Sequence, residues 1–249
     1  MSKFLIAISS CQHDQQVRDH DVVRETWGKV ADEYGVPWII NIGGDKQPIL
    51  EAHEVYTKVK DDWSSLTLKT IANCKMALNY NYDFVFQCFR DTYISVPRLV
   101  KEFPNIQNQD VVGNFYFHNF EQDYACGGSG YWMSKKFMEL LVKDANSLKI
   151  ESEDVLVGEV MKKNKIVGYH DSRYDHLTLR GGVSKHNNNI SNHLWSWYMK
   201  WPNQMGWDKY DTDWMRQEQR KELTGQWTAQ DIKRRELYTE KWGMRTHGV

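Results

Sequence analysis

Residues 84–99, FVFQCFRDTYISVPRL, predict a strand, a turn and the start of a helix within one short stretch. The first six residues are apolar except for one glutamine, which favours a buried strand. The closing VPRL favours a helix start, because the fixed φ and missing N–H of Pro97 are tolerated in a first turn. The turn between them, made of Phe89, Arg90 and Asp91, is therefore expected at the carboxyl end of a buried strand.

The same alternation of strand and helix continues on both sides of this stretch. We expect further strands at residues 3–10, 38–44, 55–60 and 110–117, and helices at residues 17–34, 66–80 and 96–103. Gly35 and Pro37 end the first helix. The pattern predicts an α/β fold with a mostly parallel central sheet and helices on both faces. Such sheets bind ligands at the carboxyl ends of their strands, where Ser9, Ser10 and Cys11 are also expected.

The helix expected over residues 66–80 is amphipathic, and its apolar side chains predict the face that packs on the core. These predicted core residues are Leu68, Ile71, Ala72, Met76 and Leu78.

Composition narrows the possible functions. The chain has 249 residues, a formal net charge of −1 and no apolar run as long as a membrane span. This gives no global electrostatic case for nucleic acid or an anionic membrane, and we expect a cytoplasmic protein without a membrane segment. The absence of GxGxxG after the first expected strand, and of a P-loop, disfavours dinucleotide cofactors and P-loop nucleotide hydrolysis. The four widely spaced cysteines form no CxxC pair and are expected to be reduced thiols.

Several segments follow one another in a recognisable order. They are VRDHDVVRETWG, KDDWSSLTLKT, the stretch at 84–99, and GGSGYWMS followed by ESEDVLVG. In this order they resemble glycosyltransferase family 31, the inverting β-1,3-galactosyl- and N-acetylglucosaminyltransferases and their fringe relatives. The resemblance covers roughly residues 3–170. It implies a GT-A fold, a nucleotide-sugar donor, a divalent metal and direct displacement at the anomeric carbon.

The resemblance also implies a catalytic base. An acceptor hydroxyl must lose its proton as it attacks, so a carboxylate is needed beside it. Asp154 matches the acid of the family's E-D-V segment and takes this role. The local sequence alone leaves a structural alternative open, in which Glu153 and Asp154 simply open a helix whose dipole favours acids.

Donor binding is carried over onto residues that match the family motifs. They are Arg18, Arg24, Asp61, Lys69, Gly128, Gly130 and Tyr131. The leaving diphosphate gathers negative charge, which arginines stabilise. Arg18 and Arg24 are six residues apart and face different sides of a helix, so Arg24 is the stronger candidate for donor contact. A solvated arginine, a surface lysine and a plain glycine turn remain structural alternatives at these positions.

The expected metal site is reduced at the strand end, where the family has three acids and this chain retains Asp91. The resemblance implies that Asp91 binds Mn²⁺ or Mg²⁺, with diphosphate oxygens and water as further ligands. A histidine from the C-terminal part is a further candidate ligand. His186 is the first choice, followed by His176, His193 and His170.

The other two residues of this turn change the expectation for the donor. Arg90 could neutralise diphosphate oxygens in place of part of the metal charge, or pair with Asp91 and disable the site. Phe89 stands where the family has an acid that reaches the ribose, so a nucleotide other than UDP remains open.

The domain organisation follows from a change of pattern. Residues 1–171 are expected to form the nucleotide-sugar-binding core, and residues 172–249 a Trp-rich helical extension that completes the site and the acceptor surface. The resemblance implies an enzyme that moves a sugar, most simply from a UDP-sugar, to an acceptor hydroxyl. The missing membrane anchor departs from the animal Golgi members of the family, so we expect a soluble bacterial or viral enzyme whose acceptor is a glycan or a hydroxymethylated base of viral DNA in the host cytoplasm. The alternative is a non-catalytic nucleotide-sugar- or glycan-binding protein on the same scaffold.

Overall fold

A computed structural model describes most of the predicted core and a small part of the predicted extension. The described residues are 3–13, 19–62, 65–118, 122–125, 127–148, 150, 152–178 and 191–195, together with Arg216, Gln219, Glu222 and Leu223.

The core is built on a central sheet of seven strands in the order β10-β6-β9-β4-β1-β2-β3. Its strands are β1 (Phe4–Ser10), β2 (Trp38–Ile42), β3 (Glu54–Tyr56), β4 (Phe84–Phe89), β6 (Val111–Gly113), β9 (Tyr131–Ser134) and β10 (Tyr169–His170). β4, β1, β2 and β3 run parallel to one another, whereas β9 is antiparallel to both of its neighbours. The prediction of an α/β fold with a mainly parallel sheet is confirmed.

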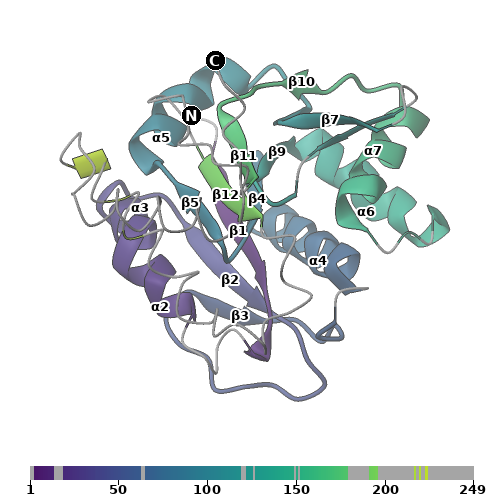
Figure 1. Ribbon diagram of the computed structural model, residues 1–249. Helices are drawn as coiled ribbons and strands as arrows, with labels where there is room; N and C mark the ends of the chain where they lie inside the picture. Colours follow the sequence, from purple (N-terminus) through teal and green to yellow (C-terminus); the bar gives the residue numbers. More distant parts are fainter. Residues whose placement is uncertain are drawn as a thin grey trace, which may run out of the picture.

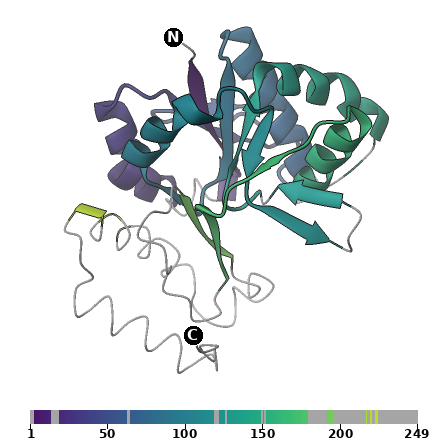
Figure 2. The ribbon, with the colours of Figure 1, turned by 90° about the horizontal axis from the view of Figure 1, so that it is seen from above.

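Helices cover both faces of this sheet. They are α2 (Asp19–Val23), η1 (Arg24–Gly28), α3 (Lys29–Glu33), α4 (Leu66–Asn79), α5 (Val96–Ile106), α6 (Lys135–Leu148) and α7 (Glu153–Lys163). α2, α3 and α5 lie on one face, and α4, α6 and α7 on the other (Figures 1 and 2). Gly35 has a φ of +65°, which explains why the first helical segment ends just before it.

The alternation of side chains along β1 divides the core into two layers. Ile6 and Ile8 pack with Val22 and Trp27 on the face of α2, and Leu5 and Ala7 pack with residues of α4, α6 and α7 on the opposite face. Both faces of β1 are buried, and this fits its apolar residues from Phe4 to Ile8. The strand becomes polar only at its carboxyl end, at Ser9 and Ser10.

Two smaller sheets flank the core. β5 (Thr92–Ile94) pairs antiparallel with β12 (Ser191–Trp195), which pairs in parallel with β11 (Tyr174–Thr178), and β7 (Phe115–His118) pairs with β8 (Gln122–Ala125). The strand expected over residues 110–117 is thus two strands, β6 and β7. The predicted boundary at residue 171 falls between β10 and β11.

The described residues of the C-terminal part return to the core. The carboxylate of Glu222 accepts hydrogen bonds from Tyr93 Oη, at 2.6 Å, and from Ser95 Oγ. Arg216 Nη2 lies 2.6 Å from Glu25 Oε2. Across the residues placed by the structure, no helix has both the length and the apolar character needed to cross a membrane.

Candidate functional site

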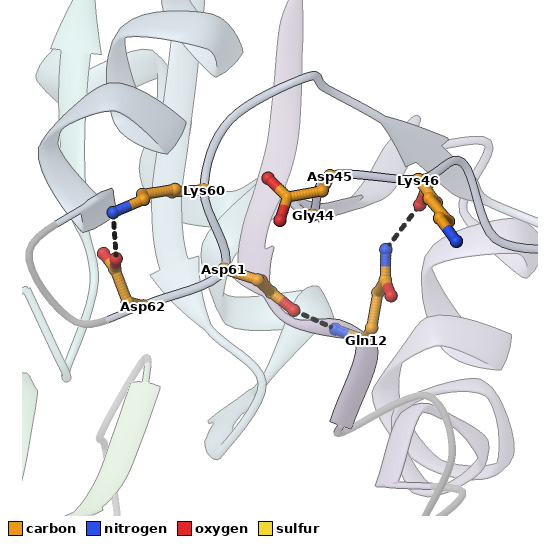
Figure 3. Close-up of a pocket in the computed structure, with 7 residues that line it drawn as sticks. All are labelled: Gln12, Gly44, Asp45, Lys46, Lys60, Asp61 and Asp62. Atoms are coloured by element: carbon orange, nitrogen blue, oxygen red, sulfur yellow. Dashed lines mark hydrogen bonds and ion pairs between the residues drawn. The ribbon is translucent and has the colours of Figure 1, made fainter.

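The carboxyl ends of β1 and β2 border a hollow of about 470 Å³ (Figure 3). It is lined by Gln12, Gly44, Asp45, Lys46, Lys60, Asp61 and Asp62. The lining contains both cationic and anionic side chains, whose apolar stems also face the hollow. Asp61 is the member of this lining that the sequence had assigned to donor binding.

Asp61 is held in place by Lys69, the first-turn lysine of α4. Lys69 Nζ lies 2.6 Å from Asp61 Oδ1 and donates a second hydrogen bond to the carbonyl of Ser10 at 2.6 Å. The side chain of Lys69 is only 2% exposed, so these partners take the place of water around its ammonium group. A Cβ on Gly43 would lie 2.7 Å from Lys69 Cε, so the absence of a side chain at Gly43 leaves room for the lysine side chain. The predicted donor residues Asp61 and Lys69 therefore form one unit.

Gln12, which also lines the hollow, contacts the second oxygen of the Asp61 carboxylate. Its backbone N–H donates to Asp61 Oδ2 at 2.6 Å, and its Nε2 donates to the carbonyls of Gly43 and Lys46. Gly44 has a φ of +131°, and a Cβ at this position would overlap the Gln12 amide. Gly44 therefore leaves room for the close approach of the Gln12 amide, as Gly43 does for Lys69.

The buried face of α4 is polar near its start, which corrects the predicted core face. Leu68 is 50% exposed, and Ala72, Met76 and Leu78 are only half-buried. Of the predicted core residues, Ile71 is buried as expected. The face turned inward also contains Lys69, Thr70, Asn73, Cys74 and Ala77.

A buried network of amides explains this polar face. Asn73 Nδ2 donates to Gln87 Oε1 at 2.8 Å, Gln87 Nε2 donates to Ser9 Oγ at 2.9 Å, and Asn41 Nδ2 donates to Asn73 Oδ1 at 2.7 Å. Thr57 Oγ1 donates to Asn41 Oδ1. These bonds tie α4 to β1, β2 and β4, and so fix the first turn of α4, with Lys69, over the edge of the sheet.

The turn after β4 contains the retained acid. Asp91 is 8% exposed, and its charge adds to burial in raising the pKa of the Cys88 thiol. Thr92 Oγ1 accepts the N–H of Phe89 and donates to the carbonyl of Gly128 at 2.7 Å. The structure therefore joins the Phe89–Asp91 turn to the glycine segment, residues 127–131, which contains Gly128, Gly130 and Tyr131 assigned to donor binding from the sequence.

The described residues contain no group of three or more His, Cys, Asp or Glu side chains that could hold a metal ion. Asp91 is present at the turn, and His186 lies outside the described residues. His170 accepts the N–H of Phe115 through Nδ1, away from this turn in the chain. The backbone register sets His193 of β12 opposite both Thr92 of β5 and His176 of β11.

The start of α7 carries two adjacent acids in different surroundings. Asp154 is half-buried, and its Oδ1 accepts the N–H of Val155 at 2.8 Å and the hydroxyl of Ser152. Glu153 is 4% exposed and accepts the hydroxyl of Tyr131 at 2.5 Å. Burial, with the charge of Asp154 adding to it, raises the pKa of Glu153 to about 8, while the Tyr131 hydrogen bond acts in the opposite direction. The sequence did not single out Glu153 as a site residue. Successive residues of a helix point in different directions, so Glu153 and Asp154 could be expected to have different surroundings.

Arg24 is engaged by acids of its own surroundings. Its Nη2 lies 2.5 Å from Glu54 Oε1, and its Nη1 lies 3.0 Å from Glu51 Oε2 and 3.1 Å from Asp21 Oδ1. Its guanidinium compensates the fully buried Glu54 carboxylate. Arg18, the other arginine predicted to bind the donor, lies outside the described residues.

A buried hydrogen-bond relay connects this arginine cluster to the edge of β1. Ser10 Oγ lies 2.6 Å from His20 Nε2, and His20 Nδ1 lies 2.8 Å from Glu54 Oε1. All three residues are less than one-tenth exposed. The relay links β1, α2 and β3. The carbonyl of Ser10 also accepts a hydrogen bond from Lys69 Nζ. The sequence contained one sign of this relay, which is the expected position of Ser10 at the end of a strand.

The parallel strands, the antiparallel β9 and the polar carboxyl edge together define a GT-A-like α/β fold. Among solved structures, the chain is similar to a glycosyltransferase involved in the glycosylation of the major capsid of PBCV-1, with a TM-score of 0.53 and 9% identity over 86% of this chain and 98% of that one. A 4-diphosphocytidyl-2C-methyl-D-erythritol synthase from Anaerococcus prevotii matches with a TM-score of 0.49 and 10% identity over 68% of this chain and 86% of that one. No protein-family model and no curated protein matches the chain. At these identities the likeness is one of fold.

Proposed function

We propose that the chain is an inverting glycosyltransferase, related to family 31, that uses a nucleotide-sugar donor. The observation that carries the proposal is the Lys69–Asp61 pair beside the hollow at the ends of β1 and β2, which is lined by charged side chains. A carboxylate fixed in this way accepts hydrogen bonds from ribose hydroxyls or from the imide N–H of uracil. UDP is therefore the first nucleotide to test.

Asp154 acts as general base in this proposal. The proton of the acceptor hydroxyl passes to the Asp154 carboxylate as the acceptor oxygen forms its bond to the anomeric carbon. The bond from that carbon to the diphosphate breaks, and its electron pair leaves with the diphosphate, so the configuration inverts. Arg90 neutralises part of the leaving charge, and the backbone of Gly128 and Gly130 lines the sugar. Tyr131, also assigned to donor binding from the sequence, is fully buried and donates its hydroxyl to Glu153, so it supports this segment from within the core.

The proposal includes a divalent cation that Asp91 and His186 would bind. When bound, Mn²⁺ or Mg²⁺ would supply positive charge at the leaving diphosphate. The described residues offer the Asp91 carboxylate but no complete ligand cluster, so none of the steps above depends on a metal.

Calorimetric titration with UDP tests donor binding, with and without Mn²⁺, on the wild type and on Asp91→Ala. Metal-dependent binding that is lost in Asp91→Ala supports a cation anchored by Asp91. Metal-independent binding that survives in Asp91→Ala supports charge neutralisation by Arg90. Failure to bind UDP, and each of a panel of other nucleotides, contradicts the proposal.

The second candidate function is a non-catalytic nucleotide-sugar- or glycan-binding protein. It is favoured by the turn after β4, where Phe89 and Arg90 stand in place of two acids. Donor binding without any release of UDP, in the presence of a broad panel of acceptors, would select this function over the enzyme.

The acceptor is proposed to be a glycan or a hydroxymethylated base of DNA, with residues 172–249 contributing to its surface. Binding of duplex DNA that weakens with rising salt would support the nucleic acid acceptor. Absence of DNA binding at low salt would leave the glycan acceptor.

A further inference from the structure

The Glu153 carboxyl occupies an unusual place for an acid. It lies at the first residue of α7, is 4% exposed, and has a phenol rather than a cation as its hydrogen-bond partner in the described chain. An ionised carboxylate at such a position would be strongly destabilising, because burial removes its hydration. A carboxyl that keeps its proton avoids this cost.

The contacts of this carboxyl lead directly to the glycine segment. A Cβ on Gly127 would overlap Glu153 Oε1 and would lie 3.2 Å from Phe89 Cε2. The carboxyl therefore packs on the bare backbone of Gly127, and the ring of Phe89 approaches the same point. Tyr131, four residues further on, donates its hydroxyl to the other oxygen of Glu153. Both ends of the glycine segment are held by one side chain.

The same segment is bonded to the turn after β4. Thr92 Oγ1 donates to the carbonyl of Gly128, and Phe89 N–H donates to Thr92 Oγ1. A continuous set of contacts thus runs from the Phe89–Asp91 turn, through residues 127–131, to the first turn of α7. Asp154 is the next residue of that turn.

We propose that Glu153 is a positioning residue that acts in its protonated form, holding residues 127–131 against the start of α7 and so fixing Asp154 relative to the turn after β4. Its part in catalysis rests on the proposed function, because Asp154 is the base only in that proposal. Loss of the proton would place an unpaired charge between Gly127 and Tyr131 and loosen this junction.

Among the neighbouring groups whose pKa values are raised, Glu153 has the pKa nearest to neutral pH. Asp154 on α7 adds a negative charge, and burial raises the pKa of Tyr131 on β9 and of Cys74 on α4 well above their usual values. The pKa of Tyr124 on β8 is also raised, by burial first and then by Glu159 and Asp154. Glu153, with a pKa of about 8, therefore loses its proton before these phenols and the thiol.

The first test follows backbone hydrogen exchange of residues 128–131 between pH 6 and pH 9, after correction for the intrinsic pH dependence. The wild type is expected to lose at least tenfold protection above pH 8. Glu153→Gln, which cannot lose a proton, is expected to keep it, and Glu159→Gln, on the same helix, should behave as the wild type. Equal loss in the wild type and Glu153→Gln would overturn the proposal.

The second test compares kcat and KM across the same pH range with the donor identified by calorimetry. We expect an alkaline loss of kcat with an apparent pKa near 8 and a steady donor KM in the wild type. Glu153→Gln should restore a flat profile, and Glu153→Ala should lower kcat at least tenfold at every pH. An unchanged alkaline limb in Glu153→Gln would overturn the positioning role. Exchange that follows the expectation, without turnover on any donor, would remove the glycosyltransferase proposal alone.

Discussion

Lys69 and Asp61 are eight residues apart in the chain, yet their charged groups meet at 2.6 Å on the carboxyl edge of the sheet. The pair is asymmetric, because the lysine side chain is 2% exposed whereas the aspartate side chain is 19% exposed. The lysine is therefore the buried partner of the pair, and the aspartate is the partner that lines the hollow.

Lys69→Met is expected to weaken UDP binding at least tenfold and to lower the free energy of unfolding by about 2 kcal/mol, since it leaves Asp61 with a broken ion pair. Calorimetry and urea denaturation measure the two effects. Lys75→Met, at an exposed position of the same helix, is the control and should change neither. Unchanged UDP affinity in Lys69→Met would contradict the assignment of this edge to the donor.

Asp154→Asn is expected to reduce turnover by about 10²- to 10⁴-fold without changing donor affinity, because the amide cannot accept the acceptor proton. Its Oδ1 can still accept the N–H of Val155, so the helix start is retained. Steady-state rates with donor binding measured in parallel check this. Turnover close to that of the wild type would exclude Asp154 as the base.

Gly44→Ala is expected to destabilise the chain and to weaken nucleotide binding, because the new methyl group would overlap the Gln12 amide at a φ of +131°. Gly35→Ala is the matched control, since Gly35 also has a positive φ but a Cβ there meets nothing within 4 Å. We expect Gly35→Ala to cost about 1 kcal/mol through backbone strain alone, and Gly44→Ala more. Equal losses for the two variants would show that the Gln12 contact is unimportant.

His20→Leu is expected to lower the free energy of unfolding by about 2–3 kcal/mol, because Ser10 and Glu54 each lose a buried hydrogen-bond partner. His53→Leu is a suitable comparison, as His53 stacks on Trp38 with 31% of its side chain exposed and should cost less. Thermal and urea unfolding give both values. A serine-directed fluorophosphonate should leave Ser10 unlabelled, and labelling would indicate a nucleophilic role that this burial argues against.

The stability of the chain should depend on the protonation of Glu153. Its pKa is about 8 in the folded chain and near the usual 4.5 when unfolded, so its contribution is full below pH 4.5 and is lost as pH rises to about 8. Each unit of pKa displacement corresponds to about 1.4 kcal/mol. Glu153→Gln removes this loss and should therefore be more stable relative to the wild type at pH 8 than at pH 5. Parallel pH curves for the two proteins would refute the raised pKa.

Much of the fold follows from local patterns, whereas the site depends on distant contacts. The apolar run of β4, the helix start at Pro97 and the stop at Gly35 are all read correctly from neighbouring residues. The face of α4 is not, because the hydrophobic pattern cannot show that Asn73 finds Gln87 and Asn41 in other strands. Glu153 is missed for the same reason, since its partner Tyr131 is 22 residues away.

The amide network beneath Lys69 also restricts how this sequence can change over time. Each of Asn41, Asn73 and Gln87 satisfies the hydrogen bonds of another, so replacing any one with an apolar residue leaves its neighbours with buried, unmet polar groups. A joint replacement by well-packed apolar residues would remove that penalty, but every single step toward it passes through a less stable chain. The layer is therefore expected to persist as a unit across descendants of this sequence, even where the residues around the hollow diverge to accept different donors.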